Sequence, residues 1–208
     1  IVLDDADIDA AVAAGVRGRI ANAGQACTAS KRFIVVETVY EEFTRKFIAA
    51  VTAIATGDPT SPDTFLGPLS SSGAVDELEE IVQDAVNLGA TLHTADGAAR
   101  SGAFYPPTVL TEVTPAMRAY SEELFGPVAV VYRVPSPQAA VELANESPFG
   151  LASSVFTSDQ DEARRIAEAL EVGMVWINST SRSAPDLPFG GVKRSGVGRE
   201  LAKYGIDE

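Results

Sequence analysis

The sequence predicts an α/β protein of three layers, α/β/α, in which helices cover both faces of a mostly parallel sheet. Short apolar and β-branched stretches alternate with longer amphipathic stretches, and the connections between them are short. The stretch 128–134 is apolar over nearly its whole length, which is typical of a parallel strand buried on both faces. No linker divides the 208 residues, so we expect residues 1–208 to form one domain.

Single residues predict where several elements begin and end. Asp7 is a suitable N-cap for a helix whose apolar positions recur every four residues up to Ile20. Thr38 is expected to start the second helix, and Gly89 to end the third. Taken in order, the predicted elements are helix 8–20, strand 33–36, helix 38–55, helix 74–88, strand 91–94, strand 109–110, strand 128–134, helix 138–145, strand 152–157, helix 159–171, strand 174–178 and a short helix near 199–204.

Composition excludes several classes of protein. The chain carries 16 Lys and Arg against 29 Asp and Glu, a net charge of −13, which argues against nucleic-acid binding. One Cys, Cys27, excludes an internal disulfide framework and Cys-rich zinc sites, and we expect no metal. No apolar run reaches the ~18 residues of a membrane helix, and no signal peptide is visible. We therefore expect a protein of the reducing cytoplasm that binds no membrane.

Cys27 is the first candidate for chemistry. It lies between a predicted helix and a predicted strand, where a loop can expose the thiol and leave backbone N–H groups available for an oxyanion. A small buried hydrophobe is the commoner role of a lone Cys, and spacing alone leaves both open. The single imidazole, His93, lies in a short strand with polar neighbours, where we expect a structural or surface role.

The stretch SEELFGPV (121–128) is the second candidate. Glu122 and Glu123 precede a Phe-Gly-Pro turn that leads into the strongest predicted strand. A carboxylate at such an edge can accept hydrogen bonds from a ribose diol, and Phe125 can pack against a flat ring. Paired carboxylates could also serve acid–base chemistry. The alternative is that the two glutamates lie at a solvated helix end that leads into a turn. On spacing alone, this structure is the more common one for such a pattern.

The glycine-rich stretch PFGGVKRSGVGRE (188–200) is the third candidate. Gly191 and Gly196 have the spacing of a P-loop, but Lys-Ser/Thr does not follow, and the G-x-G-x-x-G dinucleotide pattern is absent. The stretch alone indicates only that its backbone passes closely against a neighbouring segment.

Five stretches, in their order along the chain, resemble the aldehyde dehydrogenase family over essentially all 208 residues. They read GQACTASKRFIV, SEELFGPVAVV, NESPFGLASSVFT, GMVWIN and LPFGGVKRSGVGRE. The resemblance implies the catalytic domain of an enzyme that oxidises a small-molecule aldehyde with NAD or NADP. It also implies a cysteine that forms a thiohemiacetal and then a thioester, which water hydrolyses.

The resemblance implies roles for single residues as well. Cys27 matches the nucleophile of the family, and its backbone N–H matches one donor of the oxyanion hole. Glu123 matches the glutamate that binds a ribose of the cofactor, and Phe125 matches the aromatic residue near the nicotinamide. Phe189 matches a residue beside the substrate pocket.

Within this family the chain looks most like bacterial succinate-semialdehyde dehydrogenases, through Lys31-Arg32-Phe33 and the stretch LPFGGVKRSGVGREL. A substrate with a distal carboxylate needs a positive or hydroxyl-rich pocket wall. Ser183 is the first choice for this wall, and Arg182 and Ser181 are the further candidates. The alternative, that all three are ordinary polar residues of a loop and bind no substrate, agrees equally well with the pattern.

Several parts of the family pattern are not among these 208 residues. The general-base glutamate, the oxyanion-hole asparagine and most of the cofactor-binding domain precede the counterpart of Ile1 in the family, and the last oligomerisation strand follows the counterpart of Glu208. We therefore expect a catalytic-domain fragment with little dehydrogenase activity of its own, from a protein that forms a homo-oligomer. The alternatives are another aldehyde as substrate, a CoA-acylating semialdehyde dehydrogenase, and an isolated module without catalysis.

Overall fold

The central sheet has four strands, three of which run parallel. The computed structural model describes residues 1–95 and 97–207. The strand order is β1 (Arg32–Val36), β4 (Val128–Val134), β3 (Thr108–Thr111) and β2 (Thr91–His93). β4 lies in the centre and pairs in parallel with β1 and β3, whereas the edge strand β2 is antiparallel to β3.

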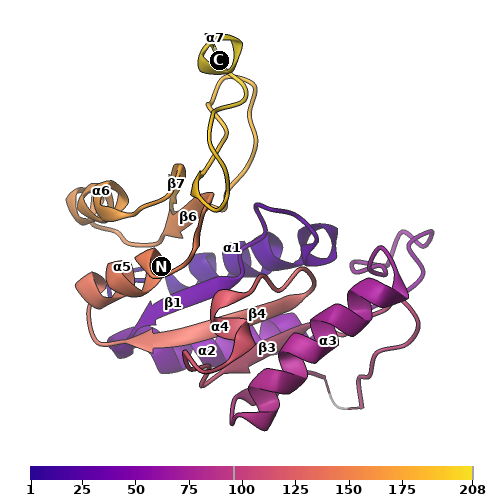
Figure 1. The fold of residues 1–208 in the computed structure, drawn as a ribbon. Coiled ribbons are helices and arrows are strands. Elements are labelled where there is room, and N and C mark those ends of the chain that lie inside the picture. The colour runs from indigo at the N-terminus through magenta and orange to yellow at the C-terminus, as the bar shows by residue number, and fades with distance from the viewer. Residues whose placement is uncertain (96, 208) are drawn as a thin grey trace.

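Helices cover both faces of this sheet (Figure 1). The helices are α1 (Ile8–Ile20), α2 (Glu37–Thr52), α3 (Ser72–Asn87), α4 (Arg118–Ser121), α5 (Pro137–Asn145), α6 (Gln160–Ala169) and α7 (Tyr204–Asp207), and the 3₁₀ turn η1 (Ala21–Gly24) follows α1. Successive strand residues point to opposite faces: Val35 packs with α1 and α2, and Ile34 packs on the face of α3 and α5. The predicted α/β/α class with a mostly parallel sheet is confirmed.

A second pair of parallel strands, β6 (Ala152–Val155) and β7 (Met174–Ile177), is joined to the main sheet by residues 1–3. The Val2 N–H donates to Ile34 O at 2.9 Å, and the Leu3 N–H donates to Phe156 O at 3.0 Å. These residues therefore lie as a short strand between β1 and the end of β6.

Several predicted helix boundaries differ from the observed ones, most by one to three residues. α2 begins at Glu37 rather than Thr38 and has no side-chain cap, because β1 runs straight into it at Val36. The last helix spans Tyr204–Asp207 rather than residues near 199–204. Glu200 instead forms an extended bridge, in which it exchanges backbone hydrogen bonds of 2.7 and 2.8 Å with Phe189.

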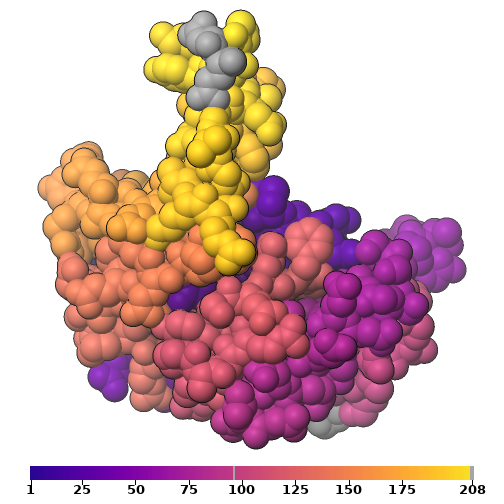
Figure 2. All heavy atoms as spheres, viewed as in Figure 1, coloured from indigo at the N-terminus to yellow at the C-terminus, as the bar shows by residue number. Residues whose placement is uncertain are grey.

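The residues after β7 rise from the body as an arm that carries α7 (Figures 1 and 2). At its base β5 (Phe149–Gly150) pairs with β8 (Val192–Lys193) in antiparallel fashion. The glycine-rich stretch does pass closely against other backbone, since a Cβ on Gly173 would lie 1.9 Å from Gly190 O. Across residues 1–95 and 97–207, no helix is both long and apolar enough to cross a membrane.

Asp5 joins the first residues of the chain to the start of α6. Its carboxylate accepts hydrogen bonds from Thr157 Oγ1 at 2.5 Å, from the Ser158 N–H at 3.0 Å and from the Asp159 N–H at 2.9 Å. Burial alone would raise the pKa of Asp5, but the hydrogen bonds from Ser158, Thr157 and Asp159 outweigh it and hold this pKa below its usual value.

Asp5→Asn is expected to lower the free energy of unfolding by about 0.5–1.5 kcal/mol at pH 7, because the amide cannot accept all of these bonds and solvent screens this exposed side chain. A depressed folded-state pKa adds stability above the unfolded pKa of about 3.9, and this contribution is lost as pH falls through the folded value. The difference between wild type and variant should therefore shrink below pH 4 in urea titrations. Asp4→Asn is the control, since Asp4 is exposed like Asp5 but accepts none of these hydrogen bonds, and equal losses for both variants would contradict their contribution.

Candidate active site

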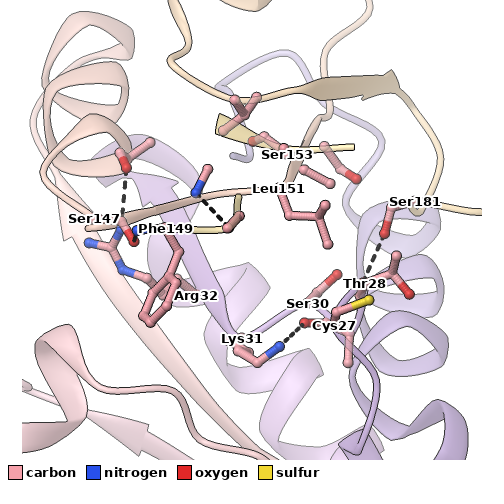
Figure 3. Close-up of a pocket in the computed structure, with 18 of the residues that line it drawn as sticks. Cys27, Thr28, Ser30, Lys31, Arg32, Ser147, Phe149, Leu151, Ser153 and Ser181 are labelled. Atoms are coloured by element: carbon pink, nitrogen blue, oxygen red, sulfur yellow. Dashed lines mark hydrogen bonds between the residues drawn. The ribbon is translucent and has the colours of Figure 1, made fainter. Parts of the chain in front are cut away.

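A cleft of about 720 Å³ opens where four distant parts of the chain meet. They are the loop between α1 and β1, the loop before β4, the region of β5 and β6, and the base of the arm. Figure 3 shows Cys27, Thr28 and Ser181 close together at this cleft, with the Lys31 side chain reaching toward the same loop. The cleft therefore gathers residues from four of the five stretches that carry the family resemblance.

Three consecutive residues with left-handed backbone shape the loop that carries Cys27. Asn22, Ala23 and Gly24 have φ values of 51°, 54° and 74°, and they turn the chain sharply after α1. The side chain of Asn22 donates to Gln25 O at 3.0 Å, which stabilises this turn. The turn is why the residues after α1 form an ordered loop at the cleft instead of another helical turn.

Cys27 presents a free, exposed thiol at the cleft, so it is not a small buried hydrophobe. Within the described chain, the backbone N–H groups of Cys27 and Thr28 have no hydrogen-bond acceptor. Ser181 Oγ donates to Thr28 O at 2.8 Å and ties the loop to the base of the arm. A thiol beside N–H groups without an acceptor has the chemistry that a nucleophile with an oxyanion site requires.

Two cations, Lys31 and Arg19, feel the charge of Glu123, which lines the cleft. Lys31 Nζ lies 2.8 Å from Glu123 Oε1, and burial lowers the pKa of Lys31 while the hydrogen bond to Glu123 opposes this. Arg19 is fully buried and donates from Nη2 to Gly24 O at 2.6 Å. Burial lowers the pKa of Arg19 to about 10, and the charge of Glu123 again opposes the shift. The negative charge of Glu123 therefore favours the protonated form of both Lys31 and Arg19.

The predicted site residues fall into three groups: those that line the cleft, one beside it and two outside it. Glu123 and Phe189 line the cleft together with Cys27. Phe125 lies beside it, where the residue is 46% exposed and the centroid of its ring is 5.9 Å from Lys31 Nζ. Arg182 and Ser183 are exposed residues of the arm, and the structure does not bring them into the lining; their neighbour Ser181 is the one that lies there.

Sequence patterns missed the two cations. Lys31 entered only as a marker of a subfamily, although a lysine four residues after a candidate nucleophile is itself a signal. Arg19 gave no signal, because an arginine on an amphipathic helix normally faces solvent. His93 does not line the cleft; its Nε2 lies 3.0 Å from Thr111 Oγ1 on β3. In residues 1–95 and 97–207, no group of three or more His, Cys, Asp or Glu could hold a metal ion.

The whole chain, residues 1–208, matches the aldehyde dehydrogenase family, and it therefore belongs to that family. It is 56% identical to the succinate-semialdehyde dehydrogenase [NADP(+)] of Deinococcus radiodurans and 48% identical to succinate-semialdehyde dehydrogenase [NADP(+)] 1 of Mycobacterium tuberculosis. All of this chain is covered in both cases, but only 44% and 46% of those proteins. The chain thus spans less than half the length of the curated relatives it matches.

Solved structures agree with this membership. The succinic semialdehyde dehydrogenase of Streptococcus pyogenes, solved in complex with NADP+, superposes with a TM-score of 0.94 at 40% identity. That comparison covers 99% of this chain and 46% of the other. The succinate-semialdehyde dehydrogenase of Burkholderia pseudomallei superposes with a TM-score of 0.93 at 44% identity, over 99% of this chain and 43% of the other.

Proposed function

We propose that the protein containing these residues oxidises succinate semialdehyde to succinate with NADP+ or NAD+, and that Cys27 is its nucleophile. The observation that carries the proposal is the exposed Cys27 thiol beside two backbone N–H groups, of Cys27 and Thr28, for which the described residues supply no acceptor. Membership of the aldehyde dehydrogenase family and the names of the relatives support the reaction, the substrate and the cofactor. Residues 1–208 are its proposed catalytic domain.

The proposed reaction begins when the Cys27 thiolate attacks the aldehyde carbon and forms a thiohemiacetal. The N–H groups of Cys27 and Thr28 are placed to donate to the oxyanion that develops at this step. Glu123 and Phe125 would hold NADP+ or NAD+, which would supply the acceptor for the hydride that leaves this carbon, and a thioester would remain on Cys27. Water then attacks the thioester, releases the acid and restores the thiol.

Glu123 and Phe125 are the proposed cofactor contacts, and their placement fits a nucleoside. The Glu123 side chain is 39% exposed at the cleft and uses Oε1 for Lys31, so Oε2 can accept from a ribose diol. Phe125 exposes almost half of a large apolar ring, which is the kind of surface a flat heterocycle covers. The ribose and the ring would then lie on the same side of the cleft.

Charge supports an acidic aldehyde. Besides the ion pair of Lys31 with Glu123, the cleft lining carries Arg32, Arg194 and Arg199 against Glu122 and Glu200, although the chain as a whole has a net charge of −13. The Ser181 hydroxyl already donates to Thr28 O, so cationic side chains are the better partners for a distal carboxylate. Ser183 and Arg182 stay predictions, as do Phe189 as a substrate contact, the homo-oligomer and the cytoplasmic location.

A comparison of two aldehydes of equal length tests the proposal. With the complete gene product and NADP+, kcat/KM for succinate semialdehyde is expected to exceed that for butanal by at least about tenfold, because only the first has a carboxylate. NAD(P)H formation and succinate release are both measured, with and without CoA. Equal values for the two aldehydes would contradict the substrate, and a product that requires CoA would contradict the hydrolytic reaction.

A further inference from the structure

Lys31 links the loop of the nucleophile to the proposed cofactor contact. It lies directly before β1, and its ammonium group donates to Ala26 O at 3.3 Å and to Ala29 O at 3.2 Å, on either side of Cys27. The same nitrogen lies 2.8 Å from Glu123 Oε1, 92 residues further along the chain. An ammonium group has three N–H donors, and these three oxygens match them in number.

We propose that Lys31 is a positioning residue: anchored by the carbonyls that flank Cys27, it fixes the Glu123 carboxylate for the cofactor at a set place relative to the thiol. This inference rests on the proposed function and adds to it a residue that acts through Glu123. It assigns Lys31 no contact with the reacting atoms.

Burial and geometry both support this role. The Lys31 side chain is only 18% exposed, whereas Glu123 is 39% exposed and comes from the loop after α4. A half-exposed glutamate on a loop has several rotamers of similar energy, and an ordered cation beside it selects one. Lys31 Nζ also lies 5.9 Å from the centroid of the Phe125 ring, so one cation contacts both proposed cofactor residues.

The direct test uses the complete gene product with Lys31→Met, Lys31→Arg and Glu123→Gln. Lys31→Met removes the charge but keeps the length of the side chain, and it is expected to weaken NADPH binding about tenfold, the loss of one charge-assisted hydrogen bond. Binding is measured by the fluorescence of titrated NADPH, which requires no turnover. The KM for NADP+ should rise by the same factor, while the KM for the aldehyde changes less than about twofold.

A double variant separates positioning from general damage. If Lys31 acts through Glu123, then Lys31→Met combined with Glu123→Gln should bind NADPH no more weakly than Glu123→Gln alone. Lys31→Arg keeps the charge and should restore at least about a third of wild-type affinity. Lys46→Met is the matched control, since Lys46 is a surface lysine paired with Asp9 at 2.6 Å and Glu42 at 2.8 Å, outside the cleft, and its removal should leave binding unchanged.

The pH dependence of binding gives a readout that a purely structural lysine would not move. Burial lowers the pKa of Lys31 from its ordinary 10.5, Glu123 and Cys27 raise it, and Arg19 lowers it further. Because the ammonium loses its proton as pH rises through this lowered pKa, wild-type affinity for NADPH should fall on the alkaline side. In Lys31→Arg the guanidinium stays charged, and affinity should stay level over the same range.

Two results would overturn the inference. One is unchanged NADPH affinity in Lys31→Met, and the other is an additive loss in the double variant. Both can occur with a wild-type protein that oxidises succinate semialdehyde normally, so they would leave the proposed function intact. A wild type that forms no NAD(P)H with the aldehyde, but whose NADPH affinity falls in Lys31→Met, would contradict the proposed reaction and support the positioning role.

Discussion

Cys27→Ser in the complete protein is expected to lower NAD(P)H formation from succinate semialdehyde by about a thousandfold or more. The hydroxyl is nearly the same size as the thiol, but it is a weak nucleophile at neutral pH without a base that takes its proton. His93 is the only imidazole of these 208 residues, and it lies outside the cleft. Steady-state rates for wild type and variant measure the effect.

The same substitution has a clear control. NADPH affinity should stay within about twofold of wild type, because serine removes no proposed cofactor contact. A variant that binds NADPH normally and keeps more than a tenth of the wild-type rate would show that another residue attacks the aldehyde.

Gly24→Ala is expected to lower the free energy of unfolding by about 2–5 kcal/mol, from left-handed strain and overpacking combined. Gly24 has φ +74°, and a Cβ built on it would lie 2.2 Å from Gly126 O and 2.4 Å from Arg19 Nη2. The backbone carbonyl cannot move away without shifting the turn before β4. The loop of Cys27 and the loop of Glu123 therefore touch at this glycine, and the variant should also lose dehydrogenase activity.

Gly97→Ala is the matched control for this variant. Gly97 has φ +73°, but a Cβ there would meet nothing within 4 Å. Its substitution should cost only the backbone strain, about 1–2 kcal/mol. Denaturant titrations of both variants isolate the contribution of the steric clash, and equal losses would contradict the close approach of the two loops.

The sequence predicts those elements whose signals are local. The strand 128–134 has its observed bounds because its apolar residues fill both buried faces of the sheet. Asp7 caps α1 as predicted, with its side chain accepting from the Ala10 N–H. The start of α2 and the position of α7 were wrong, because a strand that runs directly into a helix and a long-range bridge between Phe189 and Glu200 leave no local signal.

The site was less accessible from sequence than the fold. Patterns alone left Cys27 and Glu123 ambiguous, and the resemblance to a family supplied their roles. The pairing of Lys31 with Glu123 joins residues 92 positions apart, and no periodicity connects them. Ser181 is half-buried in the cleft lining whereas Ser183 is exposed outside it, and the continuous polar run of residues 178–183 contains no signal that separates these two positions.

Trapping of the covalent intermediate tests the central claim most directly. The complete protein is mixed with succinate semialdehyde and NADP+, quenched in acid within the first turnover, and digested for mass spectrometry. A succinyl group is predicted on the peptide that contains Cys27, formed in step with the first burst of NADPH. A burst of NADPH without this adduct, or with the succinyl group on another residue, would contradict the assignment of Cys27 as the nucleophile.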